Sequence, residues 1–148
     1  MDEQRRVLIE SDRDLVDARA AARELALRLG FSRTDATLIA TAISEIARNI
    51  VVHVGQGTVV MSPLLEEARY GVRVVAEDEG IGIRDVEAAL EDGYAGRGGL
   101  GLGLSGARRL MDEFEIDTGA DRGTRVTMTK WRIRDELERL RERRNARP

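Results

Sequence analysis

The chain contains no cysteine, and this absence excludes disulfides, thiolate metal sites and catalytic cysteine nucleophiles. Its single histidine, His53, excludes a histidine-rich zinc site as well. Aromatic residues make up only 3% of the sequence, so aliphatic side chains must pack the core. No apolar run approaches the roughly 20 residues of a membrane span, and Met1–Glu10 lacks the pattern of a signal peptide. These absences predict a cytoplasmic protein with no membrane partner.

Length and charge predict one acidic domain with a basic tail. The 148 residues match the usual size of a single domain, and an apolar content of 42% is enough for a core. The net charge is −3, but residues 131–148 hold seven Arg against four Asp and Glu, which leaves about −6 on residues 1–130. An acidic body argues against nucleic-acid binding, since such domains normally present a basic face.

Hydrophobic periodicity predicts an α+β protein. Capping patterns at Ser11 and Ser32 each precede a helical run, and Gly30 ends the first of these runs. Adjacent strands with helices grouped elsewhere favour a two-layer α/β sandwich, with helices on one face of a mixed, largely antiparallel sheet. The predicted strands are 5–10, 58–61, 70–77, 114–117 and 124–130, with a turn at Ser62–Pro63, and the predicted helices are 11–29, 32–53, 85–90 and 104–111.

The predicted domain covers residues 1–131, and residues 132–148 form a basic amphipathic tail. Ile133, Leu137 and Leu140 recur at helical spacing in this tail. Two interpretations stay open for it, a solvated amphipathic helix and a helix that binds a partner.

The second predicted helix carries a set of polar residues along one face. Glu45, Asn49 and His53 are four residues apart, so they share one side, and Thr41 lies one turn earlier. A carboxylate and a carboxamide together can ligate Mg²⁺ through oxygen and orient a nucleophile beside it. The alternative is a solvated polar face, with His53 as a packed or rim residue.

Two glycine-bearing segments could bind a nucleotide. Asp78-x-Gly80-x-Gly82 ends an apolar strand, where a carboxylate can accept a hydrogen bond from an exocyclic amine and the glycines let backbone approach a flat ring. In the segment 96–104, glycines alternate with leucines before a helix, a pattern typical of an anion-binding nest. The alternatives are an ordinary turn and a flexible linker.

Other nucleotide motifs are excluded by their context. Gly101, Gly103 and Gly106 match G-x-G-x-x-G, but the preceding residues 91–96 cannot form the buried strand that a dinucleotide site needs. The sequence has neither a P-loop nor the signatures of eukaryotic kinases.

Taken in order, these segments resemble the ATP-binding domain shared by gyrase, Hsp90, histidine kinases and MutL (GHKL), which has the Bergerat fold. Glu45-x-x-x-Asn49-x-x-x-His53 is similar to its N box, and Asp78-x-Gly80-x-Gly82 to its first glycine box. Gly99-x-Gly101-x-Gly103 resembles the second glycine box, and Gly123-Thr124 the last. The resemblance covers residues 5–131. Within the superfamily, the chain resembles the anti-sigma-factor serine kinases, above all the stressosome switch kinases.

The resemblance implies ATP and Mg²⁺ as cofactors and assigns a role to each motif. Glu45 is expected to accept the serine proton, Asn49 to ligate Mg²⁺, Asp78 to accept the adenine amine, and Thr124 to lie near the adenine pocket. The residues expected to bind the nucleotide are Asn49, Asp78, Gly80, Gly82, Arg97, Gly98, Gly99, Leu100, Gly101, Leu102, Gly103 and Thr124.

The same resemblance implies a serine/threonine kinase that works by partner switching. Its substrate is expected to be a serine of a STAS-domain antagonist, and the released kinase is expected to activate a PP2C-type phosphatase. One alternative is an anti-sigma factor kinase that sequesters a sigma factor and phosphorylates its own antagonist. Another is a non-catalytic nucleotide sensor, against which Glu45 argues, since binding alone needs no base.

Overall fold

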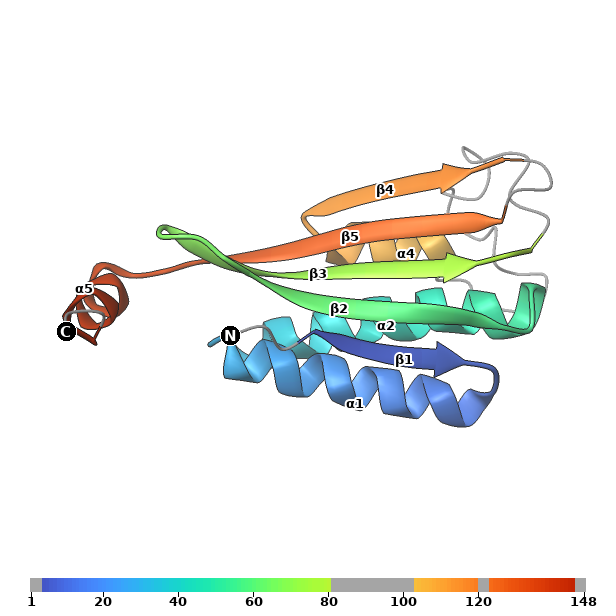
Figure 1. Cartoon of the computed structure of the whole chain (residues 1–148), viewed down its shortest axis with the longest axis horizontal. Coiled ribbons are helices and arrows are strands. Elements are labelled where there is room, and N and C mark those ends of the chain that lie inside the picture. Colours follow the sequence, from blue (N-terminus) through green and yellow to red (C-terminus); the bar gives the residue numbers. More distant parts are fainter. Residues whose placement is uncertain (1–3, 81–102, 120–122, 146–148) are drawn as a thin grey trace.

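The computed structural model describes residues 4–80, 103–119 and 123–145. These residues form two layers, in which helices cover one face of a five-stranded sheet (Figure 1). The strand order is β1-β2-β3-β5-β4, and all four neighbouring pairs are antiparallel. The predicted α+β sandwich is confirmed, whereas the parallel pairing that a mixed sheet implies does not occur among the described strands.

The N-terminal third of the chain folds as its local signals predict. β1 (Arg5–Ile9) leads into α1 (Asp12–Arg28), and α2 (Arg33–His53) follows. The Asp14 carboxylate accepts a hydrogen bond from the Ser11 N–H at 3.1 Å. The Ser32 hydroxyl accepts one from the Asp35 N–H, also at 3.1 Å, so both helices begin at capped turns.

The later strands are longer than their sequence patterns indicate. β2 spans Gly57–Leu65, β3 spans Arg69–Asp78, β4 spans Glu113–Thr118 and β5 spans Thr124–Ile133. The turn predicted at Ser62–Pro63 is wrong, because both residues continue β2 and pair with β3. β1 pairs with β2 only up to Met61, so Pro63 lies where one side of the strand is an edge and a missing N–H is tolerated.

Two helices complete the described chain, α4 (Gly103–Leu110) and α5 (Glu136–Asn145). The helix predicted at 85–90 lies outside the described residues. No helix in the described ranges combines the length and apolar character that crossing a membrane requires.

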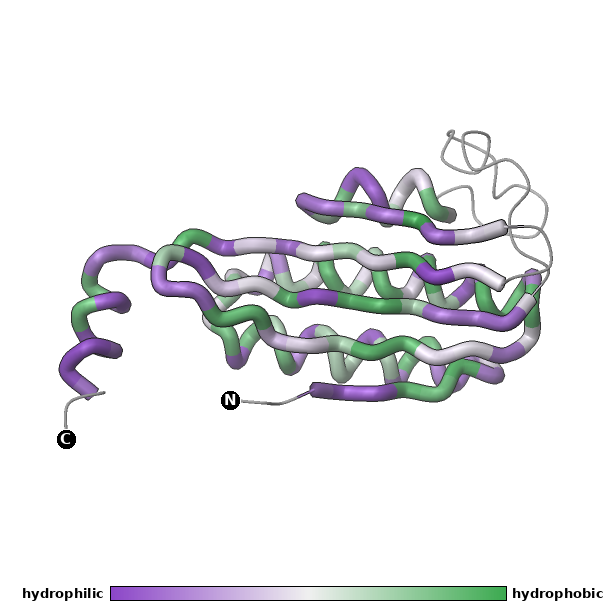
Figure 2. The backbone as a smooth tube through the Cα atoms, turned by 45° about the horizontal axis from the view of Figure 1, so that its top comes forward, coloured by the Kyte–Doolittle hydropathy of each residue, from purple (hydrophilic) through white to green (hydrophobic). Residues whose placement is uncertain are grey.

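The core lies between the helices and the sheet. Burial alternates along β2 from Gly57 to Met61, as expected for a strand with one face on the core, and Figure 2 shows hydrophobic and hydrophilic residues interspersed along the sheet. α1 and α4 both pack on α2, and Leu104 and Ala107 of α4 are buried in the core. The largest fully buried side chains are Ile9, Leu25, Leu29, Ile39, Ile43, Met61, Met128, Val59, Val72 and Val74.

Candidate active site

The centre of the candidate site is the polar stripe of α2. Glu45 and Asn49 are one turn apart on this helix, as their spacing predicts. Glu45 is only 8% exposed, and Asn49 is half-buried. Buried Ile46 and Ile50 lie beside them and anchor the helix in the core, so its apolar packing fixes where the two polar side chains point.

Neither polar side chain is engaged by the described part of the protein. Within residues 4–80, 103–119 and 123–145, Glu45 and Asn49 have no side-chain hydrogen bond, and Glu45 has no ion pair. Both side chains are therefore available to a ligand or a metal. Carboxylate and amide oxygens are the donors that Mg²⁺ prefers. This pair therefore fits a site for Mg-ATP.

A second part of the site lies at the end of the β3–β5 pair. Asp78 is the last residue of β3, and its direct cross-strand partner is Thr124, the first residue of β5. One carboxylate oxygen of Asp78 accepts a hydrogen bond from the Gly80 N–H at 2.9 Å. That bond fixes the orientation of the carboxylate, while its second oxygen has no hydrogen bond within the described residues.

Close backbone packing holds this end of the sheet together. Gly123 has a φ of +76°, and a Cβ there would lie 2.2 Å from the carbonyl oxygen of Asp78. Only glycine fits both the conformation and the space. The backbone at Gly123 is therefore packed directly against the backbone at Asp78 and Glu79.

Two further glycines bring α2 to the same end of the sheet. A Cβ on Gly57 would lie 2.8 Å from a methyl carbon of Ile50 and 2.6 Å from the carbonyl oxygen of Glu77. A Cβ on Gly80 would lie 2.9 Å from a methyl carbon of Val54. The C-terminal end of α2 therefore packs against the start of β2 and the end of β3, where Asp78 lies.

Thr118 supports the site and was not predicted. Its hydroxyl donates a hydrogen bond to the carbonyl oxygen of Gly123 at 3.0 Å and lies 2.9 Å from the Thr124 hydroxyl. It is the last residue of β4, five positions before Gly123, so these contacts join the end of β4 to the start of β5. No motif in the sequence marks it, since its role depends on β4–β5 pairing.

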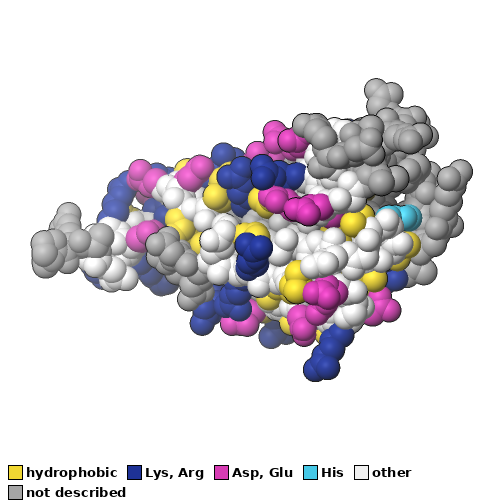
Figure 3. All heavy atoms as spheres, turned by 45° about the vertical axis from the view of Figure 1, so that its right-hand side comes forward, with side chains coloured by type: hydrophobic (Ala, Val, Ile, Leu, Met, Phe, Trp, Pro, Cys, Tyr) yellow, Lys and Arg dark blue, Asp and Glu magenta, His cyan; other side chains and the backbone are white. Residues whose placement is uncertain are grey.

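Thr41 and His53 do not add to the candidate site. The Thr41 hydroxyl donates to the Thr37 carbonyl at 2.8 Å, so it is engaged within the helix. His53, the last residue of α2 and the cyan side chain of Figure 3, is exposed, which excludes its interpretation as a packed residue.

The remaining predicted nucleotide contacts mostly lie outside the described residues. Gly103 is described, and it is the first residue of α4. The predicted contacts outside the described residues are Gly82, Arg97, Gly98, Gly99, Leu100, Gly101 and Leu102.

Comparison with known proteins identifies the family of the chain. The model of the histidine kinase-like ATPase domain family matches residues 9–130. The chain is 42% identical over 131 residues to the serine/threonine-protein kinase RsbT of Bacillus subtilis (strain 168), covering 88% of this chain and 98% of that protein. It is 31% identical over 120 residues to an anti-sigma F factor of Bacillus licheniformis, covering 76% of this chain and 81% of that protein.

A solved structure shows a more distant likeness. The histidine kinase domain from the Erythrobacter litoralis EL346 blue-light activated histidine kinase superposes with a TM-score of 0.48 at 21% identity. The superposition covers 80% of this chain and 59% of that one.

Proposed function

The chain belongs to the histidine kinase-like ATPase domain family, and from this we propose that it is a serine/threonine-protein kinase that uses Mg-ATP. We propose further that it acts in the cytoplasm on a serine of a STAS-domain antagonist and, when released, activates a PP2C-type phosphatase. Similarity to RsbT over nearly all of that relative's length supports the kinase activity.

The unpaired carboxylate of Glu45, one helical turn from Asn49 on α2, is the observation that carries the proposal. A domain that only binds nucleotide needs no proton acceptor at this position. A kinase needs a group that receives the proton of the attacking hydroxyl. Glu45 is such a group, and Asn49 lies one helical turn from it.

Glu45, Asp78 and Asn49 have different roles in the proposed phosphoryl transfer. The serine oxygen forms a bond to the γ-phosphorus, the bond from that phosphorus to the oxygen of ADP breaks, and the serine proton passes to Glu45. Asp78 accepts the adenine amine and so fixes the nucleotide. Asn49 would ligate Mg²⁺, which neutralises charge on the phosphates.

Phosphate transfer from labelled ATP to a STAS-domain protein tests the proposal directly. We expect metal-dependent labelling of serine by the wild type and a loss of about 10²–10⁴-fold for Glu45→Ala, as is typical for removal of a general base. ATP affinity should be retained, because Glu45 is assigned to proton transfer rather than to binding. Undiminished transfer by Glu45→Ala would refute the role, and tight ATP binding without transfer by the wild type would favour a nucleotide sensor.

The alternative function is an anti-sigma factor kinase. The 31% identity to an anti-sigma F factor supports it, and the ATP chemistry would be the same. A pulldown with sigma factors separates the two, because a switch kinase should not bind a sigma factor stably. Stable binding would replace the phosphatase with a sigma factor as the downstream partner.

A further inference from the structure

The outer side of α2, opposite to the isoleucines that the helix buries, carries a stripe of small polar residues and one arginine. At about 100° per residue, the members of this outer stripe fall within about 60° of one another around the helix axis. They are Thr37, Thr41, Ser44 and Arg48, of which Thr37 is exposed and the other three are half-buried. Glu45 follows Ser44 in the chain and lies one turn from Thr41, so the outer stripe borders the proposed proton acceptor.

The hydroxyl groups of the outer stripe are hydrogen-bonded within the helix. Thr37, Thr41 and Ser44 each donate to the backbone carbonyl four residues earlier, at 2.9, 2.8 and 3.0 Å. Residues 36–44 contain no charged side chain, although 34% of the whole chain is charged. A partner that covers these hydroxyls therefore leaves no donor unpaired and buries no charge, which lowers the cost of desolvation.

Arg48 is the charged end of the outer stripe. Its Nε is buried and has no hydrogen-bond acceptor in the described parts of the chain. Glu45 lies three positions earlier, a spacing at which helical residues form ion pairs, yet these two described side chains form none. The guanidinium is therefore available to an anionic group of a ligand, which it can bind through a charge-assisted hydrogen bond.

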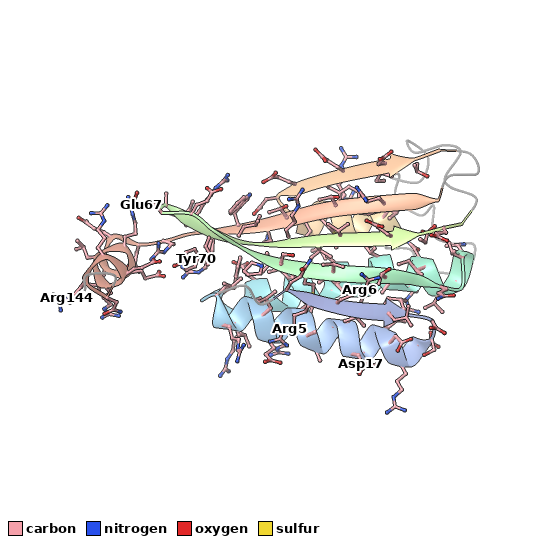
Figure 4. All side chains as sticks on the ribbon, viewed as in Figure 1. Arg5, Arg6, Asp17, Glu67, Tyr70 and Arg144 are labelled. Atoms are coloured by element: carbon pink, nitrogen blue, oxygen red, sulfur yellow. The ribbon has the colours of Figure 1, made fainter. Side chains whose placement is uncertain are left out.

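The arginines of α5 lie too far from Glu45 to bind the same ligand. Arg139 and Arg143 pair with Glu67 at the tip of the β2–β3 hairpin. Figure 4 shows Glu67, Tyr70 and Arg144 at this end of the molecule, where Figure 1 places α5 remote from the candidate site. A positive charge that acts beside Glu45 must come from the body of the domain.

The position of Glu45 limits where a protein substrate can lie. Under the proposed function, on which this inference rests, the serine hydroxyl must come within about 2.6–3.2 Å of the Glu45 carboxylate. Asn49 lies on the other side of Glu45 from the outer stripe and is assigned to the metal. The protein that brings the serine must then contact the neighbours of Glu45 on the outer side of α2, and these are the residues of the outer stripe.

We propose that the outer stripe binds an extended segment of the phosphoacceptor protein that carries the serine and, within two residues of it, a carboxylate held by Arg48. Helical residues three positions apart have Cβ atoms about 5–6 Å apart, which is the separation between Glu45 and Arg48. An extended segment advances about 3.3 Å per residue, so an offset of two residues spans this separation. Arg48 determines which serine is accepted, and the uncharged part of the outer stripe packs against the rest of the segment.

Steady-state phosphorylation of the STAS-domain protein that the wild type labels, at saturating ATP, tests the role of Arg48. Arg48→Gln should raise the KM for the protein substrate by about tenfold or more, because a hydrogen bond to a charged group is lost. ATP affinity should be unchanged, and circular dichroism should show a folded domain. Arg73→Gln is the matched control, because Arg73 is an exposed arginine on the opposite face of the sheet and has no ion pair within the described ranges. Its KM should equal that of the wild type.

Charge reversal distinguishes a direct contact from a general effect of charge. Arg48→Glu should weaken the wild-type substrate further, and replacing the carboxylate near the acceptor serine with lysine should weaken it for the wild-type kinase. Combining the two reversals should restore the KM to within about threefold of the wild-type pair. Thr41→Arg tests the uncharged part of the outer stripe, since it introduces a long charged side chain without loss of helix propensity. It should raise the KM for the protein by about tenfold while ATP affinity stays constant.

The outcomes separate this proposal from the proposed function. An unchanged KM in Arg48→Gln, or a double reversal that does not restore the KM, would overturn the docking surface while the kinase assignment stands. Weaker ATP binding by Arg48→Gln would assign Arg48 to the nucleotide and would also overturn it, as would a labelled serine with no carboxylate within two residues. A wild type that labels no STAS-domain protein would refute the proposed function itself, and the docking proposal with it.

Discussion

Replacing Gly123 with alanine should disturb both the stability of the domain and its nucleotide site. The backbone at Gly123 has φ +76°, a conformation that costs an L-residue about 1–2 kcal/mol. The new Cβ would also lie 2.2 Å from the carbonyl oxygen of Asp78 and 3.0 Å from the Cα of Glu79. Both are backbone atoms, so relief of the clash requires the end of β3 to move, at a further cost of about 1–3 kcal/mol.

Gly55 provides a matched control for this substitution. It has φ +100°, but a Cβ there would meet nothing within 4 Å. Gly55→Ala should therefore lose about 1–2 kcal/mol from the backbone conformation alone and keep its ATP affinity. Gly123→Ala should lose about 2–5 kcal/mol and bind ATP at least about tenfold more weakly, because displacement of β3 moves Asp78.

Urea unfolding and nucleotide titration of the two variants measure these differences. The free energies of unfolding should differ by the cost of the clash, about 1–3 kcal/mol, and ATP affinity should fall only for Gly123→Ala. Equal unfolding free energies together with equal ATP affinities would show that the β3–β5 end tolerates a side chain. In that case, Gly123 would not position Asp78.

Three further changes probe the site and the tail. Asp78→Asn should weaken ATP binding measured by titration, and an unchanged affinity would count against the adenine contact. Thr118→Val removes the bond to Gly123 and should lower the free energy of unfolding by about 1 kcal/mol in urea, whereas no change would mean that β4 does not brace the site. Arg132 lowers the pKa of the Glu138 carboxyl to about 2, so its ion pair stabilises the fold above about pH 5 and is lost as the pH falls toward 2. In urea unfolding near pH 7, the free energy of unfolding of the wild type should exceed that of Glu138→Gln by about 0.5–1 kcal/mol. A difference in unfolding free energy that persists unchanged at low pH would contradict the pairing.

The elements with strong local signals were predicted correctly from the sequence. The capping residues and helical periodicity of residues 11–53 lie close together in the chain, and both helices form where expected. Pro63 misled the prediction of β2, because a proline usually ends a strand and here it lies beside an edge. Whether a proline lies at an edge depends on which strands are neighbours, and no local pattern contains that information.

The candidate site shows the same division between local and long-range information. Helical geometry alone predicts that Glu45 and Asn49 share a face, and the structure confirms it. The pairing of Asp78 with Thr124 depends on strand register across 46 positions. Thr118 and the contact between Gly57 and Ile50 also arise only from tertiary packing, so the sequence could not reveal them.

The position of β5 has a consequence for synthesis of the protein. β5 is the last strand along the chain, yet it lies between β3 and β4 rather than at an edge. The sheet cannot close until residues 124–133 have emerged from the ribosome, and until then the paired face of β3 remains exposed. Because Thr124 belongs to that strand, a nascent chain that lacks it cannot form the Asp78–Thr124 pair at which we propose that the nucleotide binds. Under this proposal, ATP stabilises only chains that have already inserted their final strand.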